Sequence, residues 1–252
     1  MNFIGIIPAR YQSVRFPGKP LVDLAGKPMI VRTYEQVCKV KLFENVIVAT
    51  DDQRIYQAVS SSGGKAVMTS DTHTSGTERC ADALSQLNYA PNETVVVNIQ
   101  GDEPFIQPEQ IEEIMACFDN PNTQIATLIK KIENEEMLQN PNVVKAVVSD
   151  SGKALYFSRF AIPFLRDNSF EDAVFYKHIG IYAYRSEVLN AIVKLPISSL
   201  EKAESLEQLR WLQAGYEIQT FQTQHEDTIG IDTPQDLEKV GRGEISSFLV
   251  RK

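Results

Sequence analysis

Short apolar runs alternate with stretches of helical periodicity through the first half of the chain. The apolar runs are brief and rich in Val and Ile, a pattern that predicts buried strands. The strands expected on this basis are 2–7, 45–49, 65–68, 94–99 and 124–129. The amphipathic stretches between them predict helices at 29–40, 53–62, 76–87 and 109–118. This alternation indicates an α/β fold with a mainly parallel, Rossmann-like sheet flanked by helices and functional groups at the carboxyl ends of the strands.

Helix-start signals support these boundaries. Ser75-Gly-Thr-Glu78 reads as a capping box, and Pro108 suits the first turn of the following helix. Thr233-Pro234 begins a last helix that runs to about Val240, with Thr as N-cap and Pro at the first helical position. These three helix starts are therefore predicted from local chemistry as well as from periodicity.

The pattern changes after about residue 140. Strands are expected at 143–148, 154–157, 176–184 and 216–222, with a helix at 204–214. No internal repeat or low-complexity linker separates this part from the rest. We therefore expect a single domain over 1–252, in which about 140–185 form a smaller antiparallel arm for substrate binding or dimerisation.

Composition narrows the class of protein. The formal net charge of −8 argues against non-specific binding to nucleic acid or to a membrane surface. Three widely spaced cysteines without a C-x-x-C pair suggest reduced thiols, and no signal peptide or apolar segment of about 20 residues is evident. We expect a cytoplasmic protein with no nucleic-acid or membrane partner, in which local cations meet any anionic ligand.

A basic loop follows the first expected strand. Between Pro8 and Pro28 it carries four cations, opposed by a single Asp23, and its Pro and Gly residues allow close bends. These cations are Arg10, Arg15, Lys19 and Lys27. Such a loop at a strand end suits a polyphosphate. It is not a Walker A sequence, and a solvated basic face remains the alternative.

Two aspartates lie at loop positions suited to a metal. Asp102 comes just after the apolar strand 94–99, and Asp232 just before the Thr-Pro helix start. Two carboxylates that face one crevice, together with phosphate oxygens, would complete an oxygen site for Mg²⁺. Either residue alone could equally serve a turn or a helix end.

Further polar groups lie among apolar strand and helix residues. The strand-to-helix junction 74–79 could bind a base or phosphate, or simply cap its helix. Arg159, His178 and Tyr182 could recognise a carboxylate and hydroxyls if they point inward, although each alone is more often structural. Glu207-Gln208 could be the solvated face of a helix.

Taken together, these segments resemble the 3-deoxy-manno-octulosonate cytidylyltransferase family. Matching blocks occur in order over roughly 3–240. They are Ile7-Pro-Ala-Arg-Tyr, Arg15-Phe-Pro-Gly-Lys-Pro-Leu21, Ala49-Thr-Asp51, Ser75-Gly-Thr-Glu-Arg79, Asn98-Ile-Gln-Gly-Asp-Glu-Pro104, Ala154-Leu-Tyr-Phe-Ser-Arg159, His178-Ile-Gly-Ile-Tyr182, Leu206-Glu-Gln-Leu-Arg210 and Ile231-Asp-Thr-Pro234. Departures at Val14, Phe16 and Phe164 remove no charge.

The resemblance implies transfer of CMP from CTP to 3-deoxy-D-manno-octulosonate (Kdo), with release of diphosphate and a need for Mg²⁺, in lipopolysaccharide biosynthesis. It implies catalytic roles for Arg10, Lys19 and Asp102, and Mg²⁺ ligation by Asp102 and Asp232. The CTP-binding residues it implies are Ala9, Arg10, Ser13, Lys19, Ser75, Gly76, Thr77 and Gln100. Candidates for binding the sugar acid are Arg15, Arg79, Arg159, His178, Tyr182, Glu207 and Gln208.

The family also implies a homodimer. The alternatives are a cytidylyltransferase for an amino-substituted Kdo or another 2-keto sugar acid, or a non-catalytic nucleotide-binding module. The joint presence of Asp102, Asp232, Arg10 and Lys19 argues against the module.

Overall fold

The structure is a computed structural model that describes residues 1–12, 16–166, 169–225 and 230–241. The chain divides into two compact units. Unit 1 comprises Met1–Glu112 and His225–Lys252, and unit 2 comprises Glu113–Gln224. The expectation of a single domain with an arm stays a prediction.

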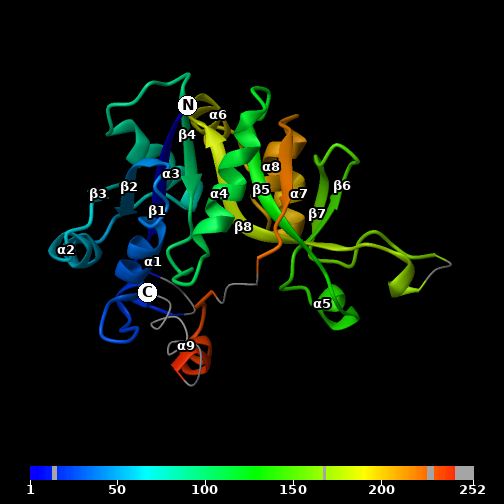
Figure 1. Cartoon of the computed structure of the whole chain (residues 1–252), viewed down its shortest axis with the longest axis horizontal. Coiled ribbons are helices and arrows are strands. Elements are labelled where there is room, and N and C mark those ends of the chain that lie inside the picture. Colours follow the sequence, from blue (N-terminus) through cyan, green and yellow to red (C-terminus); the bar gives the residue numbers. More distant parts are fainter. Residues whose placement is uncertain (13–15, 167–168, 226–229, 242–252) are drawn as a thin grey trace. The chain divides into compact units, whose positions relative to one another are not determined.

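Unit 1 contains four parallel strands (Figure 1). They lie in the order β3-β2-β1-β4. Their bounds are β1 Asn2–Ala9, β2 Phe43–Thr50, β3 Ala66–Met68 and β4 Thr94–Asn98. From β1 the chain adds β2 and β3 on one side and then β4 on the other side, so the strand order reverses between β1 and β4. Such a switch point is where α/β proteins bind ligands. The expected parallel sheet is confirmed.

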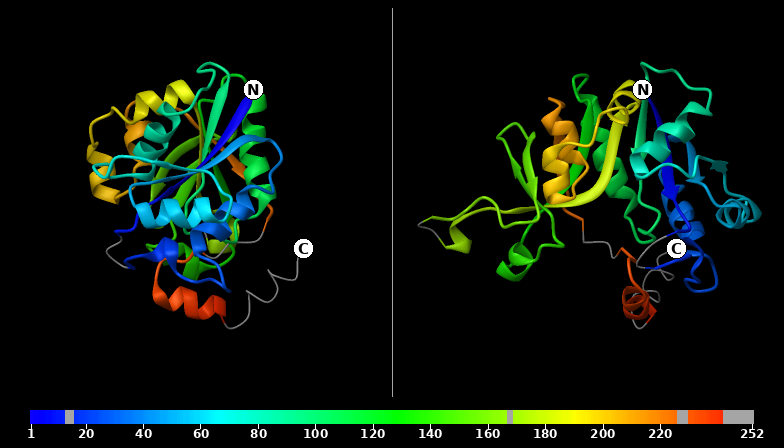
Figure 2. Two further views of the ribbon diagram at one scale, coloured as in Figure 1. Left: turned by 90° about the vertical axis from the view of Figure 1, so that its left-hand side faces the viewer. Right: turned by 180° about the vertical axis from the view of Figure 1, so that it is seen from behind.

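Helices run along the strands of unit 1 (Figure 2). They are α1 Met29–Val37, α2 Gln53–Ser61 and α3 Gly76–Ser85. Unit 1 also contains the 3₁₀ helix η1 Lys19–Leu21 and helix α9 Pro234–Gly241. Helix α3 packs against β1, β2 and β4. Helix α4, Pro108–Ala116, spans the sequence boundary between the units. The helices expected in the first half are thus present, each within a few residues of its predicted bounds.

Unit 2 is built on mixed strands. Strand β5 Ile125–Lys131 pairs with β8 Tyr176–Arg185 in antiparallel and with β9 Ile218–Gln222 in parallel orientation. Strand β6 Lys145–Val148 pairs antiparallel with β7 Ala154–Ser158 and with β8. The helical segments are η2 Cys117–Asp119, α5 Glu135–Gln139, η3 Phe170–Asp172, α6 Ser186–Ile192, α7 Ser199–Glu204 and α8 Gln208–Gln213. The expected antiparallel character after residue 140 is confirmed.

One helix prediction is wrong. The stretch 204–214 does not form a continuous helix, because α7 ends at Glu204 and Ser205 adopts a left-handed conformation with φ of 53°. The chain then enters α8 at Gln208. Periodicity alone missed the break because serine is not a glycine-like stop signal. Helices α5 and α6 were not expected from the sequence either.

The segment before α9 is anchored in the core of unit 1. Ile231 is fully buried and clusters with Leu24, Met29 and Phe105. Its backbone N–H donates to the carbonyl of Asp102 at 2.9 Å, which ties the segment to the loop after β4. Thr233 and Asp236 exchange hydrogen bonds at the start of α9, with Thr233 N–H donating to the Asp236 carboxylate at 3.0 Å. The expected helix start is confirmed.

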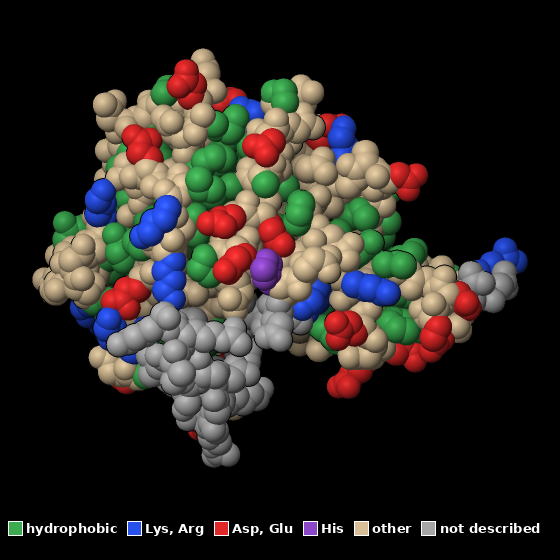
Figure 3. All heavy atoms as spheres, viewed as in Figure 1, with side chains coloured by type: hydrophobic (Ala, Val, Ile, Leu, Met, Phe, Trp, Pro, Cys, Tyr) green, Lys and Arg blue, Asp and Glu red, His purple; other side chains and the backbone are tan. Residues whose placement is uncertain are grey.

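Acidic and basic side chains are mixed over the face shown in Figure 3, so that on this face an anionic ligand has to be met locally. Among the described residues, no helix has the length and apolar character required to cross a bilayer. Cys38, Cys80 and Cys117 form no disulfide among the described residues.

Candidate active site

A pocket of about 290 Å³ lies at the carboxyl ends of β1 and β4. All its lining residues belong to unit 1. Pro8, Ala9 and Arg10 come from the end of β1, and Gln100, Gly101 and Asp102 from the loop after β4. The remaining residues come from η1, α1, α3 and the segments before α3 and α9. The switch point between β1 and β4 therefore carries a pocket, as the strand order leads one to expect.

Gly18 sets the position of Lys19. Its φ of 74° is left-handed, and an added Cβ would meet the Tyr11 ring at 3.0 Å. Its N–H donates to the Tyr11 carbonyl at 3.0 Å, which closes the basic loop before η1 begins at Lys19. A glycine is needed here because other residues adopt this conformation at a cost. The turn directs the lysine into the pocket.

Lys19 lies between two carboxylates. Its Nζ donates to Asp102 Oδ2 at 2.5 Å and to Asp232 Oδ1 at 3.0 Å. Burial alone would lower the pKa of the ammonium, but the two carboxylates outweigh it and raise the pKa above its ordinary value. Asp102 and Asp232, which lie 83 and 213 positions after Lys19 in the sequence, therefore meet at one point of the pocket.

The backbone makes a close approach beneath these ion pairs. A Cβ at Gly101 would lie 3.0 Å from the Pro8 carbonyl oxygen. Thr33 on α1 holds the same loop, because its hydroxyl donates to the Gly101 carbonyl at 3.1 Å. Only glycine lets the loop after β4 lie this close to the end of β1. Asp102 is consequently fixed next to the basic loop.

The two aspartates also fit a divalent cation. Both carboxylates converge on one cationic atom, and carboxylate oxygens are preferred ligands of Mg²⁺. In the described part of the chain, no group of three or more His, Cys, Asp or Glu side chains is arranged to hold a metal by itself. Mg²⁺ commonly takes one or two protein carboxylates and completes its coordination with substrate phosphates and water. The donor set suits a metal that arrives with a phosphorylated substrate.

The N-terminus of α3 faces the pocket through Ser75 and Gly76. The capping box is present: Ser75 Oγ accepts from Glu78 N–H at 3.1 Å, and Glu78 Oε2 accepts from Ser75 N–H at 3.3 Å. The same carboxylate oxygen also accepts from Thr74 N–H at 2.7 Å. Burial would raise the pKa of Glu78, but these N–H donors outweigh it and lower the pKa. The first turn of α3 therefore has a fixed geometry and presents N–H groups that favour an anion.

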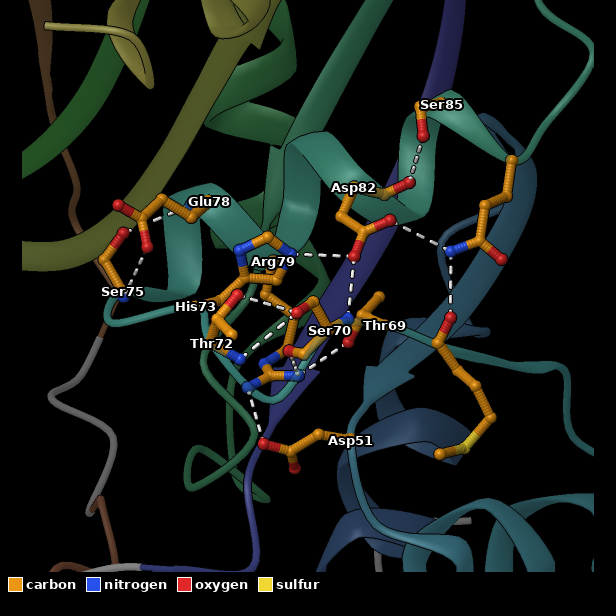
Figure 4. Close-up of polar contacts among 12 residues, drawn as sticks. Asp51, Thr69, Ser70, Thr72, His73, Ser75, Glu78, Arg79, Asp82 and Ser85 are labelled. Carbon is orange, nitrogen blue, oxygen red and sulfur yellow. Dashed lines mark hydrogen bonds and ion pairs between the residues drawn. The ribbon is translucent and has the colours of Figure 1, made fainter.

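Arg79 is buried and hydrogen-bonds to the loop 69–75 that precedes α3 (Figure 4). Its Nη2 donates to Asp51 Oδ2 at 2.9 Å, and its Nη1 to Thr69 Oγ1 at 2.6 Å and to the Ser70 carbonyl at 3.3 Å. Only 3% of the residue is exposed. Arg79 thus connects the end of β2, the loop after β3 and α3.

His73 lines the pocket and was not selected from the sequence. Its Nε2 lies 2.7 Å from Asp82 Oδ2, and the same carboxylate oxygen accepts from Ser70 N–H at 2.8 Å (Figure 4). Asp82 lies one turn after Arg79 on α3, so both residues hold the 69–75 loop from one helix. The only sequence signal for the pair is that His73 and Asp82 lie nine positions apart, on either side of a helix start.

The candidates for sugar-acid binding in the second half lie in unit 2. On β8, the His178 Nε2 lies 3.0 Å from Thr127 Oγ1, and the ring packs against Tyr182 with centroids 5.2 Å apart. Burial lowers the pKa of His178 to about 3, so its imidazole is neutral near pH 7. Arg159 follows β7 and is half-buried. Glu207 and Gln208 lie at the start of α8, where Gln208 is buried and Glu207 is partly exposed.

Comparison with known proteins now identifies the group to which the chain is related. The model of a family described as cytidylyltransferase matches residues 4–239. The chain belongs to the cytidylyltransferase family. The 3-deoxy-manno-octulosonate cytidylyltransferase of Parabacteroides distasonis is 56% identical over 95% of this chain and 96% of its own length. That of Bacteroides thetaiotaomicron is 55% identical over 94% and 96%. The resemblance inferred from the sequence is confirmed.

Solved structures of cytidylyltransferases agree with the fold. The CMP:2-keto-3-deoxy-manno-octonic acid synthetase complexed with CTP has a TM-score of 0.89, 44% identity and 99% coverage of both chains. The 4-diphosphocytidyl-2C-methyl-D-erythritol synthase of Anaerococcus prevotii has a TM-score of 0.62 at 15% identity, with 99% coverage of both chains. This second likeness supports the fold alone.

The pocket of this cytidylyltransferase-family chain unites most residues singled out from its sequence. The lining includes Ala9, Arg10, Lys19, Ser75, Gly76, Arg79, Gln100, Asp102 and Asp232. Thr77 is buried in the first turn of α3. Ser13 and Arg15 lie outside the described residues. The residues of unit 2 are not part of this lining.

Proposed function

We propose that this chain transfers CMP from CTP to Kdo, giving CMP-Kdo and diphosphate for lipopolysaccharide biosynthesis. The observation that carries the proposal is the convergence of Lys19, Asp102 and Asp232 in one pocket. The names of the relatives and the CTP complex of the solved neighbour support it. A non-catalytic module would not require a cation held against two carboxylates.

The chemistry needs charge neutralisation more than a covalent nucleophile. The anomeric hydroxyl of the sugar attacks the α-phosphorus of CTP and gives up its proton to water. A new O–P bond forms, and the bond to the departing diphosphate breaks. Arg10 is exposed on the pocket and, among the described residues, forms no ion pair, so its charge is available to phosphate. Lys19 provides a second cation from the same loop. Together they stabilise the negative charge of the transition state.

The base and ribose lie, in this proposal, against the start of α3. Ser75, Gly76 and Thr77 supply backbone and hydroxyl donors, and Gln100 supplies an amide after β4. Ala9 allows close approach of the nucleotide to the end of β1, and Ser13 completes the assigned CTP ligands. The buried contacts of Arg79 suit a supporting role for the loop as well as the contact with sugar acid expected from the family.

Mg²⁺ is proposed to bind at Asp102 and Asp232. When bound, it polarises the α-phosphate and lowers the pKa of the attacking hydroxyl. Asp102 and Asp232 would hold the metal through their carboxylate oxygens. Lys19 then turns from the carboxylates to the triphosphate, because its flexible ammonium can exchange one anionic partner for another.

The sugar acid is proposed to contact Arg15 together with the unit 2 residues Arg159, His178, Tyr182, Glu207 and Gln208. The guanidinium of Arg159 suits the carboxylate of Kdo, and the neutral imidazole of His178 and the Tyr182 hydroxyl suit sugar hydroxyls. We also propose a cytoplasmic homodimer. Exposed apolar side chains at Leu155, Phe160, Phe164 and Val174 support an interface in unit 2.

The test is a diphosphate-release panel. CTP is compared with the other nucleoside triphosphates, and Kdo with its amino analogue and a sialic acid, with and without Mg²⁺. Release only with CTP, Kdo and Mg²⁺ is the expected result. Faster release with the amino analogue would reassign the sugar, and nucleotide binding without release from any pair would favour a sensor module.

A further inference from the structure

Unit 2 buries a lysine that the proposed chemistry does not use. Lys145, the first residue of β6, is 0% exposed. Its Nζ donates to the backbone carbonyls of Asn140 at 2.9 Å and Val143 at 2.6 Å, and also to that of Arg159. These acceptors come from the loop before β6 and from the end of β7.

The three carbonyls match the charged form of this lysine. An ammonium has three N–H donors, whereas a neutral amine has two. Among the described residues no carboxylate forms an ion pair with Lys145, so carbonyl dipoles compensate its charge. Burying an ammonium is costly even when it is hydrogen-bonded. The buried Lys145 ammonium therefore suggests a role beyond packing.

The backbone of Arg159 is contacted by both the Lys145 ammonium and the Glu204 carboxylate. Its carbonyl accepts from Lys145, while its N–H donates to Glu204 Oε2 at 2.9 Å. The other oxygen of Glu204 accepts from Ser158 Oγ at 2.6 Å. An ammonium and a carboxylate thus hold the two backbone polar groups of one residue, which fixes where its side chain begins.

Among the described residues, the guanidinium of Arg159 donates only to backbone carbonyls. Its Nε donates to the carbonyl of Glu204 at 2.8 Å, and its Nη1 and Nη2 donate to those of Pro141 at 3.2 Å and Ser205 at 3.4 Å. No carboxylate of the described residues neutralises the guanidinium. The left-handed turn at Ser205 that ends α7 presents one of these carbonyls. Arg159 is therefore oriented while its charge stays available to an external anion.

We propose that Lys145 and Glu204 are positioning residues that fix Arg159 for the carboxylate of the sugar acid. The inference rests on the proposed function. Neither residue touches the substrate; each acts through the backbone of Arg159. Loss of either should weaken sugar-acid binding selectively, because the nucleotide pocket of unit 1 shares none of these contacts.

The test compares Lys145→Met with Lys153→Met in steady-state assays. Lys153 forms an exposed ion pair with Glu217 in the same unit, so it is a matched control. For Lys145→Met we expect the KM for Kdo to rise by about 10-fold to 100-fold, the range for a displaced binding group. The KM for CTP should stay within about twofold, as should both constants for Lys153→Met. Unchanged KM for Kdo, or an equal rise for both substrates, overturns the proposal.

A double-mutant cycle with Arg159→Gln separates positioning from general damage. If Lys145 acts through Arg159, Lys145→Met should add less than about twofold to the KM for Kdo in the Arg159→Gln background. Additive effects overturn the proposal. So does an Arg159→Gln variant with normal KM for Kdo, which would exclude Arg159 while the wild-type assay still establishes the enzyme's function.

Glu204→Gln provides a variant that keeps the shape of the cluster. The amide oxygen of Gln can still accept from the Arg159 N–H, while its NH2 group can only donate to Ser158 Oγ, which reverses that bond. The negative charge is lost with little change in side-chain size, and a rise of about 3-fold to 10-fold in the KM for Kdo is expected. This variant decides the question should Lys145→Met fail to fold. An unchanged KM for Kdo would exclude the carboxylate from positioning.

Discussion

Charged groups are held differently in the pocket of unit 1 and in the Arg159 cluster of unit 2. In the pocket, Lys19 lies between two carboxylate side chains that are themselves partly exposed. In unit 2, Lys145 and the guanidinium of Arg159 donate only to backbone carbonyls in the described part of the chain. Side-chain partners can be exchanged when a ligand arrives, whereas backbone partners cannot leave. The first arrangement suits a changing charge and the second a fixed one.

Arg79 shows that unit 1 also contains a fixed cation. It is buried, and hydrogen bonds to a carboxylate, a hydroxyl and a carbonyl restrain it. The contrast is therefore between exchangeable and fixed charges, and both kinds occur in one unit. Substitutions at the two kinds should separate catalysis from stability.

The largest effect is expected at the exchangeable carboxylates. Asp102→Asn should reduce kcat by about 100-fold or more, since a neutral amide is a poor metal ligand and leaves transition-state charge unbalanced. Asp232→Asn should act in the same direction. Circular dichroism should show an intact fold. The matched control is Asp23→Asn, an aspartate substitution on the basic loop that carries Lys19, and this variant should turn over normally. Near-normal turnover of Asp102→Asn at saturating Mg²⁺ would exclude this residue from the metal site.

Lys19 tests whether the charges really exchange. Lys19→Met should reduce kcat by about 100-fold, because a phosphate-paired cation is lost. It should also raise the affinity of the free protein for Mn²⁺, measured by electron paramagnetic resonance, because the ammonium no longer competes for Asp102 and Asp232. Lys27→Met, which breaks an exposed ion pair with Glu35, should change neither quantity. Weaker Mn²⁺ binding by Lys19→Met would contradict exchange.

The fixed cation should affect stability first. Arg79→Met should lower the free energy of unfolding by about 3 kcal/mol, because it leaves Asp51 and the 69–75 loop without their buried partner. Urea denaturation measures this. Arg54→Met, which breaks an exposed pair with Asp52, is the control and should have a much smaller effect. Equal midpoints for the two variants would show that burial of Arg79 contributes little.

The smallest effect should be a dependence of stability on acid pH at Asp82. Burial would raise the pKa of this carboxyl, but Ser70 N–H and His73 outweigh it and lower the pKa below its ordinary value of 3.8. A carboxyl with a depressed pKa stabilises the fold above its unfolded pKa and loses this contribution as pH falls through the folded one. The stability difference between wild type and Asp82→Asn should therefore shrink below about pH 3.8. A difference that is constant from pH 7 to pH 3 would refute this.

Local patterns predicted the framework of unit 1 well. The Val95–Val97 run gave a strand within one residue of β4, and Ser75 with Glu78 gave the start of α3. The family blocks assigned Lys19, Asp102 and Asp232 to one nucleotide site, and the structure brings them into one pocket, but the ion pairs between them were not expected. These features depend on short-range periodicity and on strand ends that converge at one edge.

Other features depend on contacts that no local pattern encodes. The break at Ser205 requires a left-handed serine, and the partners of Lys145 are carbonyls, which every residue has. Arg79 carried the expectation of a substrate ligand, yet its visible partners are Asp51, Thr69 and Ser70. Sequence indicates that a charge is present, whereas only the fold indicates which acceptor it meets.

The hydrogen bond from Ile231 to the carbonyl of Asp102 has a consequence for synthesis on the ribosome. The pocket receives its second carboxylate only after the chain has been translated past residue 232. A nascent polypeptide that has completed every strand of unit 1 still lacks Asp232 and the buried side chain of Ile231. Catalytic competence should therefore appear late and abruptly during translation, even though most of the pocket is encoded in the first 102 residues.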